Sequence, residues 1–278
     1  MTRRRISFGV ECVKKVTIVG GDTRLKKVEQ RLMTEGFAVD TVGLYEGDNG
    51  NIATSKIVIL PVPTTRDGVN VYAPLTGRII PLSHIEDSVS SDTQVLCCNY
   101  TFKKGRCTDY NCLDSYALLN AVPTAEGAIK IAIESTPFTL WGARVLVIGY
   151  GRVGKILADR LKGLGCIVTV SARKKTDFAL INALNMAKTD TRGLNDTPLD
   201  YDIIFNTVDF TVLNNRSLEN TKCKCIIDLS SKGGFDLDFA VSKGITAIIA
   251  PGLPVKVAPE TAGEILAETI TQLIIQEG

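Results

Sequence analysis

The feature that most constrains this chain is an apolar run that breaks into spaced glycines and then continues with helical periodicity. Residues 145–148 are Val-Leu-Val-Ile, and Gly149, Gly151 and Gly154 follow in the spacing G-x-G-x-x-G. In a strand-turn-helix unit the first glycine permits a tight turn, the second lets backbone approach a pyrophosphate, and the third allows close helix-sheet packing. The helix N-terminus then faces the phosphates. We therefore expect a dinucleotide site; the alternative is a glycine-rich turn without a ligand.

Predicted strands and helices alternate along the chain around this motif. Apolar periodicity predicts strands at 145–148, 167–171, 203–206, 225–229 and 246–250, and helices at 153–164, 177–187, 216–220 and 236–243. Strands that alternate with helices favour right-handed crossovers and a parallel, doubly wound sheet. We expect an α/β Rossmann domain here.

The first part of the chain predicts a second parallel α/β domain, of flavodoxin-like type. Strands are expected at 16–19, 37–42, 56–60 and 93–98, with a helix after the glycine turn at 20–21. Residues 99–111 have no clear period and are expected to form a loop or a short hairpin. A helix near 123–136, with Thr124 as its N-cap, would connect the domains.

A chain of 278 residues is long enough for two domains. We expect a substrate domain at 1–122 and a dinucleotide domain at 123–262. A closing helix over 260–276 is expected to cross back, so that 263–278 belongs to the first domain.

Composition excludes other classes of function. The net charge is only +2, without the basic excess that binding to a phosphate backbone needs, so we expect no nucleic-acid partner. No segment approaches about 18 uninterrupted apolar residues, and the N-terminus lacks a signal-like apolar region, so we expect a cytoplasmic protein without a membrane partner.

Eight cysteines raise the question of a metal site. Cys97, Cys98, Cys107 and Cys112 lie close in sequence, but they lack paired C-x-x-C spacing, and His84 is the only histidine. We expect no metal, and we expect His84 to be a surface residue. A metal site in the 97–112 region is the alternative.

The residues after the second Rossmann strand indicate which dinucleotide is bound. An acid there favours NAD, whereas an arginine accommodates the 2′-phosphate of NADP. The chain has Ser171, Arg173 and Lys174 at this point and no carboxylate before Asp177, which favours NADP; a solvated basic turn is the alternative. The complete set of expected cofactor contacts is Gly149, Gly151, Arg152, Val153, Gly154, Ser171, Arg173, Lys174, Asn206, Thr207, Asp228 and Ser230.

Cationic residues that follow strand ends point to a carboxylate substrate. Arg66, Lys232 and Lys256 occupy such positions, and each alone could be a solvated charge. A dehydrogenase of ordinary 2-hydroxy acids is disfavoured, because the predicted cofactor domain contains no histidine to act as base. The expected substrate contacts are Asp22, Arg24, Pro63, Thr64, Arg66, Thr124, Lys256 and Thr261.

Several segments together resemble a known family, the A subunits of bacterial dipicolinate synthase. The resemblance rests on Ile18 to Asp22, Ile59 to Pro63, Val71 to Pro74, Val122 to Ala128, Val145 to Gly154, Ile226 to Ser230, Ala250 to Pro254, Lys256 to Pro259 and Thr261 to Leu266. It implies NADP-linked oxidation of a dihydrodipicolinate-type ring diacid to dipicolinate, with a flavoprotein-like B subunit, in a spore-forming bacterium. Aromatisation removes a hydride and a proton from the ring. Lys232 and Glu126 are the candidate acceptors of the proton.

Two alternatives stay open at this point. One is another NADP-dependent dehydrogenase or reductase that acts on a small hydroxy or imino carboxylate. The other is a non-catalytic NADP-binding subunit that regulates or scaffolds a partner. In each case we expect a homo-oligomer.

Overall fold

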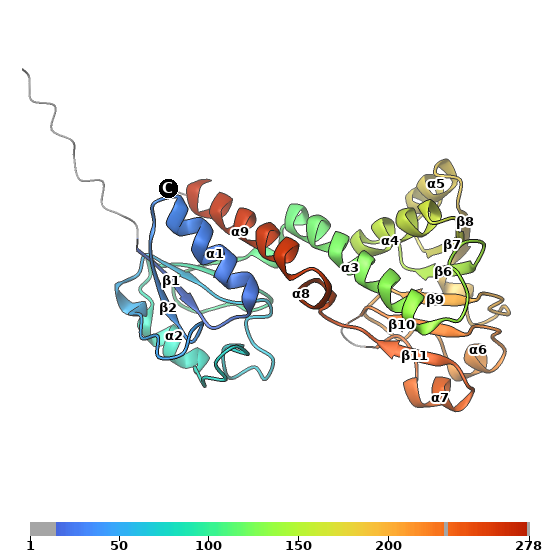
Figure 1. Cartoon of the computed structure of the whole chain (residues 1–278), viewed down its shortest axis with the longest axis horizontal. Helices are drawn as coiled ribbons and strands as arrows, with labels where there is room; N and C mark the ends of the chain where they lie inside the picture. Colours follow the sequence, from blue (N-terminus) through green and yellow to red (C-terminus); the bar gives the residue numbers. More distant parts are fainter. Residues whose placement is uncertain (1–14, 231–232, 277–278) are drawn as a thin grey trace, which may run out of the picture. The chain divides into compact units, whose positions relative to one another are not determined.

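The computed structural model describes residues 15–230 and 233–276, and it forms two compact units. The first unit runs up to Tyr116 and resumes at Gly263, and the second comprises Ala117–Ala262. Helices α3 (Asp114–Ser135) and α9 (Pro259–Gln276) each begin in one unit and continue into the other (Figure 1). The expected boundary at 122/123 lies inside α3.

The first unit contains a five-stranded parallel sheet in the order β2-β1-β3-β4-β5. This is the strand order of flavodoxin-like folds, as predicted. The strands are β1 (Lys15–Val19), β2 (Ala38–Val42), β3 (Ile57–Ile59), β4 (Gln94–Cys97) and β5 (Arg106–Asp109), and the helices wholly within the unit are α1 (Thr23–Thr34) and α2 (Leu82–Ser88). Short 3₁₀ turns cover 52–54 and 110–112.

The C-terminal helix packs beside α1 in the first unit (Figure 1). Both helices place an apolar stripe on the same core as strands β1, β3 and β4. The buried residues of the two stripes are Leu25, Val28 and Leu32 from α1, and Leu266, Ala267, Ile270 and Ile274 from α9. Burial of these side chains removes apolar surface from water and holds α9 in place. The predicted return of the closing helix is confirmed.

The second unit contains a six-stranded parallel sheet in the order β11-β10-β9-β6-β7-β8. The order reverses between β6 and β9, which makes this the Rossmann arrangement that the sequence predicted. Its elements are β6 (Arg144–Ile148), α4 (Arg152–Gly163), β7 (Ile167–Ala172), α5 (Lys175–Ala183), β8 (Ala187–Asp190), β9 (Ile203–Asn206), α6 (Asn215–Glu219), β10 (Cys225–Asp228), α7 (Leu237–Ser242), β11 (Thr246–Ile249) and α8 (Leu253–Val257). A 3₁₀ turn covers 191–193.

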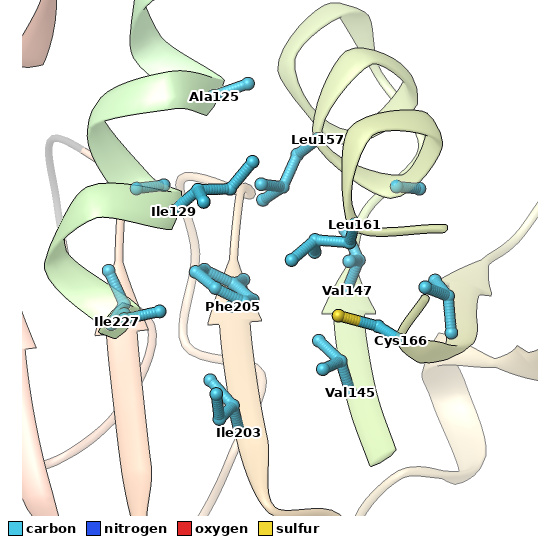
Figure 2. Close-up of a cluster of buried hydrophobic side chains, with 14 of the residues drawn as sticks. Ala125, Ile129, Val145, Val147, Leu157, Leu161, Cys166, Ile203, Phe205 and Ile227 are labelled. Carbon is cyan, nitrogen blue, oxygen red and sulfur yellow. The ribbon is translucent and has the colours of Figure 1, made fainter. Parts of the chain in front are cut away.

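One face of this sheet is covered by α3 and α4, whose side chains meet over the central strands (Figure 2). The middle strands are apolar on both faces, which is the pattern of a sheet covered by helices on two sides. The cluster in Figure 2 includes Ala125, Ile129, Val145, Val147, Leu157, Leu161, Cys166, Ile203, Phe205 and Ile227.

The sequence-based interpretation of residues 99–111 and 177–187 was incomplete. Residues 106–109 form β5 and residues 187–190 form β8, each a parallel strand at the edge of its sheet. Edge strands are partly solvated and do not need an apolar run. Polar sequences such as Ala-Lys-Thr-Asp therefore gave no strand signal.

The prediction that Thr124 begins a helix was wrong. Helix α3 runs through Pro123, and the Thr124 hydroxyl donates to the Asn120 carbonyl oxygen at 2.8 Å, one turn earlier. Proline lacks the N–H that would pair with the Leu119 carbonyl, a loss that normally disfavours helix. Packing of buried Ala125 and Ala128 on the sheet offsets that loss.

Candidate dinucleotide site and substrate loops

The turn after β6 requires glycine at two positions. Gly149 has a φ of +97°, and a Cβ there would lie 2.5 Å from Thr207 Oγ1 and 2.6 Å from Val208 Cγ1. A Cβ on Gly154 would collide with the carbonyl oxygen of Gly149. The hydroxyl of Thr207 also donates to the Ile148 carbonyl oxygen at 2.9 Å, which fixes the turn against the neighbouring strand. Close packing of turn, helix and strand therefore explains both glycines.

Neither packing nor backbone conformation requires a glycine at position 151. Its φ is −77°, which any residue adopts, and no heavy atom lies within 4 Å of an added Cβ. Gly151 is also the N-cap of α4, and no side chain caps the helix there. The first turn of α4 therefore has no capping side chain, and the helix dipole favours an anion beside it. The turn fits the pyrophosphate of a dinucleotide, with exposed Arg152 and half-buried Val153 following it.

A basic pair follows β7, the next strand of the Rossmann order. Arg173 and Lys174 are exposed, and the guanidinium carbon of Arg173 lies 5.2 Å from the ring centroid of Phe210. Phe210, which follows β9, is 42% exposed. An arginine stacked on an aromatic ring keeps its donors available for a phosphate. The sequence did not indicate Phe210 as a site residue, because a single aromatic residue in a loop has no periodic pattern.

Ser171 does not share this exposure. Its side chain is fully buried, and its hydroxyl lies 2.6 Å from the Thr191 hydroxyl. That pairing uses the hydroxyl inside the unit, so Ser171 supports the end of β7 rather than presenting a group to a ligand. The sequence could not indicate Thr191 as a partner, because the intervening strand β8 was not predicted.

Asn206 and Asp228 form a buried network that shapes the loops after β9 and β10. The Asn206 amide donates to Asp228 Oδ1 at 3.0 Å and to the Val208 carbonyl oxygen at 3.0 Å. Asp228 also accepts from the backbone N–H groups of Ser230, at 2.8 Å, and Gly234, at 2.5 Å. The residues expected to contact cofactor here therefore pair with one another, and they position the loops.

Replacing Gly234 with alanine should destabilise the second unit. An added Cβ would collide with the Asn206 amide and would lie 3.3 Å from Asp228 Oδ2, so the buried network must shift. We expect a loss of about 2 kcal/mol in the free energy of unfolding, measured by urea denaturation. Gly163→Ala, where an added Cβ meets nothing within 4 Å, is the control. Equal stability of the two variants would contradict this role of Gly234.

In the first unit, Asp22 and Arg24 form a buried ion pair at the end of β1. Arg24 Nε donates to Asp22 Oδ1 at 2.9 Å, and Nη2 donates to Oδ2 at 2.7 Å and to the Val62 carbonyl oxygen at 2.5 Å. Burial alone would lower the pKa of Arg24, but the bonds to Asp22 outweigh it and raise that pKa. The pair thus ties the turn after β1 to the loop after β3. Much of the charge of Arg24 is already neutralised by Asp22.

Removing the arginine of this pair should cost far more than removing a surface arginine. Arg24→Ala leaves the Asp22 carboxylate buried without its bidentate partner, so we expect a loss of about 3 kcal/mol in the free energy of unfolding. Arg31→Ala breaks a pair with Glu35 whose side chains are 48% and 37% exposed, and should cost less than about 1 kcal/mol. Chemical denaturation compares the two. Equal losses in the free energy of unfolding would show that the buried pair stabilises the fold no more than the exposed pair does.

Tyr116 lies in the same region and was not predicted as a site residue. Its side chain is 1% exposed, its ring meets Tyr110 edge-on at 5.8 Å, and its hydroxyl has no hydrogen-bond partner among the described residues. Burial raises the pKa of Tyr116 to about 12, against the opposing effect of the Arg24 charge, so the hydroxyl stays protonated at neutral pH. A lone tyrosine at the start of a helix gave the sequence analysis no signal.

The loop after β3 presents one exposed cation. Thr64 is fully buried, and its hydroxyl accepts from the Cys98 backbone N–H at 2.8 Å, which makes it a structural residue. Half-buried Pro63 follows a cis peptide bond. Arg66 is exposed, and its guanidinium carbon lies 4.0 Å from the centre of the Tyr72 ring. Among the expected contacts in this loop, Arg66 alone offers an accessible charge.

The remaining predicted residues are distributed as follows. Glu126 Oε1 pairs with Arg160 Nη2 at 3.3 Å, and Arg160 lies about 12 Å along α4 from the glycine turn. This is a surface ion pair, and it gives Glu126 no catalytic surroundings. Exposed Lys256 donates to the Pro251 carbonyl oxygen at 3.0 Å, and Thr261 is exposed in α9. Lys232 lies outside the described residues.

Two broader properties concern the described residues only. No helix within 15–230 and 233–276 is long and apolar enough to cross a bilayer. Over the same residues, no group of three or more His, Cys, Asp or Glu side chains is arranged to hold a metal ion. His84 is exposed in α2, as predicted.

Comparisons with known proteins give a consistent result. Residues 15–104 match the family described as the N-terminal domain of the dipicolinate synthase A subunit. The A subunit of dipicolinate synthase from Bacillus subtilis is 32% identical over 286 residues, covering 94% of this chain and 96% of that protein. The crystal structure of the A subunit from Bacillus halodurans has a TM-score of 0.84 at 31% identity, covering 94% of this chain and 97% of that one. D-lactate dehydrogenase of Salmonella, at 16% identity, has a TM-score of 0.62 over 93% of this chain and 95% of that one, which shows a shared two-domain dehydrogenase fold.

Proposed function

Because this chain belongs to the family of dipicolinate synthase A subunits, we propose that it is an NADP-dependent dehydrogenase that oxidises a dihydrodipicolinate-type cyclic dicarboxylate to dipicolinate. The observation that carries the proposal is the turn after β6, where no side chain caps the N-terminus of α4 and no heavy atom lies within 4 Å of a Cβ added to Gly151. Such a terminus binds pyrophosphate through backbone N–H groups. Bound NADP⁺ would accept the hydride that leaves the ring.

The preference for NADP rests on the residues after β7. Arg173 and Lys174 are exposed there, and the chain has no carboxylate between residues 171 and 176 that could bind a ribose 2′-hydroxyl. A guanidinium stacked on the Phe210 ring offers two parallel donors to a 2′-phosphate. Lys174 adds a second positive charge beside it.

A ring diacid calls for cations, and the described residues offer two accessible ones among those predicted. Arg66 is exposed over Tyr72 in the first unit, and Lys256 is exposed in α8 of the second. Each can pair with a carboxylate of the substrate. Aromatisation also releases a proton, and we keep Lys232 as the proposed acceptor on its place in the sequence after β10. Glu126 is withdrawn from that role.

The family name also bears on assembly. An A subunit implies a B subunit, and we propose that this chain works with a flavoprotein-like B subunit in the cytoplasm of a sporulating cell. We further propose that the chain forms a homo-oligomer.

The proposal is tested by mixing the purified chain with NADP⁺ and freshly generated dihydrodipicolinate, with and without a B subunit. NADPH and dipicolinate should appear together, and NAD⁺ should support less turnover. Oxidation of 2-hydroxy acids without dipicolinate formation would instead identify a hydroxy-acid dehydrogenase. Dinucleotide binding without turnover on any substrate, with B present, would indicate a non-catalytic subunit.

A further inference from the structure

Two cysteine thiols touch at the edge of the first sheet. Cys97 ends β4 and Cys107 lies in β5, and their sulfur atoms are 3.2 Å apart. In the ladder of these strands Val95 is opposite Cys107 and Cys97 is opposite Asp109, so the two cysteines are diagonal neighbours. In a disulfide the sulfur atoms are about 2.05 Å apart, so these two lie about 1 Å beyond bonding distance.

The loop over residues 98–106 covers this pair. The Tyr100 carbonyl oxygen accepts from Cys97 Sγ at 2.9 Å and lies 3.9 Å from Cys107 Sγ. Asn99 adopts a φ of +54°, and its backbone N–H donates to Asp109 Oδ2 at 3.0 Å. The loop is thus anchored at its start beside the sulfur atoms and in its middle by buried Phe102, while the side chains of Asn99, Thr101, Lys103 and Lys104 are exposed.

The two thiols differ in access and in acidity. Cys97 is fully buried, whereas Cys107 is half-buried. Contact with Cys97 lowers the pKa of Cys107, while contact with Cys107 and burial raise the pKa of Cys97. Cys107 is therefore the thiol that reacts first, and Cys97 is placed to attack it afterwards.

We propose that Cys97 and Cys107 are a redox-active dithiol, with Cys107 as the thiol that attacks low-molecular-weight disulfides and Cys97 as the resolving thiol. Intracellular disulfides are usually transient and redox-sensing, and two cysteines in contact on neighbouring strands suit such a role. Neither thiol belongs to the dinucleotide site, so this property is independent of the proposed dehydrogenase activity.

The reaction balances without any further reagent. The Cys107 thiolate attacks one sulfur of a disulfide RSSR, forms a protein–S–S–R bond and releases RS⁻, which takes the proton that Cys107 had lost. The Cys97 thiol then loses its proton, attacks Cys107 Sγ and releases a second RSH. In sum, two protein thiols are oxidised to one disulfide and RSSR is reduced to two RSH.

Oxidation would close a covalent ring around the loop 98–106. Cys98, the residue after Cys97, pairs through its backbone with Thr64 in the loop after β3, at 2.8 Å and 3.3 Å. A cross-link at Cys97 would therefore restrict motion beside the proposed substrate loop as well as within 98–106. Slower amide exchange is the expected consequence.

The test treats the purified full chain with oxidised glutathione and maps its thiols by alkylation and peptide mass spectrometry. We expect a Cys97–Cys107 cross-link, with a mass lower by about 2 Da than the reduced chain, and complete reversal by dithiothreitol. Hydrogen exchange should slow for residues 99–105 in the oxidised form. An unchanged exchange rate would contradict the expected restriction of the loop by the cross-link.

Three variants separate the roles of the thiols. Cys97→Ser should accumulate a glutathione adduct on Cys107, and Cys107→Ser should leave Cys97 reduced. Cys112→Ser, which removes an exposed cysteine of the same region, should leave the cross-link unchanged. If the Cys97 variant does not fold, the time course of the native chain decides: the Cys107 adduct must precede the cross-link. An adduct on Cys107 that never converts, or reaction at Cys112 alone, would overturn the proposal.

Discussion

Replacing Gly151 with aspartate should abolish dinucleotide binding while the second unit stays folded. The φ of −77° and ψ of −161° at this position suit a side-chain-bearing N-cap, and no heavy atom lies within 4 Å of the added Cβ. Aspartate is a favoured N-cap and stabilises the first turn of a helix. The same carboxylate would occupy the first-turn N–H groups and repel the pyrophosphate. We expect the dissociation constant of NADP⁺ to rise at least about 100-fold, or about 2.7 kcal/mol.

Isothermal titration calorimetry measures the affinity, and thermal unfolding checks the fold. Gly163→Ala, at the far end of the same helix and also in open space, is the matched control and should bind NADP⁺ normally. If Gly151→Asp binds NADP⁺ as tightly as the native chain, the turn is not a phosphate site.

Replacing Arg173 with alanine should separate the two nicotinamide cofactors. The guanidinium over Phe210 is the proposed partner of the 2′-phosphate, which NAD⁺ lacks. Loss of a charge-assisted pair costs about 2 kcal/mol, so the dissociation constant of NADP⁺ should rise about 30-fold. The dissociation constant of NAD⁺ should change less than about threefold, because the pyrophosphate turn is untouched.

The same titrations on Arg160→Ala provide the control. Arg160 lies in the last turn of α4 in a surface pair with Glu126, at the opposite end of the helix from the glycine turn, so its loss should change neither affinity. Equal weakening of both cofactors by Arg173→Ala would assign Arg173 a general role, and the preference for NADP would lose its support.

The central strands of both sheets could be predicted from the sequence because they are buried on two faces. Residues 145–148 and 203–206 are continuous apolar runs, and the observed strands agree with them to within one residue. Edge strands β5 and β8 carry polar, half-exposed residues and gave no such signal. The predicted helix began at Pro123, although α3 begins at Asp114 and continues through this proline. Local helix propensity does not include the tertiary packing that stabilises the helix on both sides of Pro123.

The candidate site was predictable where function depends on backbone shape. Close packing explains Gly149 and Gly154 in the glycine spacing after β6, whereas an added Cβ at Gly151 meets nothing within 4 Å. Hydrogen bonds between buried side chains could not be predicted in this way. Ser171 with Thr191, and Asn206 with Asp228, join residues about twenty positions apart whose contact depends on tertiary structure. Sequence position suggested ligand contacts for them, whereas their polar atoms are used inside the unit.

The most direct test of the proposed function follows a hydrogen from the substrate. Dihydrodipicolinate deuterated at its ring carbons is oxidised by the chain with NADP⁺ and a B subunit, and the reduced cofactor is analysed by mass spectrometry. The proposed hydride transfer predicts one deuterium in each NADPH and one NADPH for each dipicolinate. Dipicolinate formed without NADPH, or NADPH without deuterium, would contradict hydride transfer from the ring to NADP⁺.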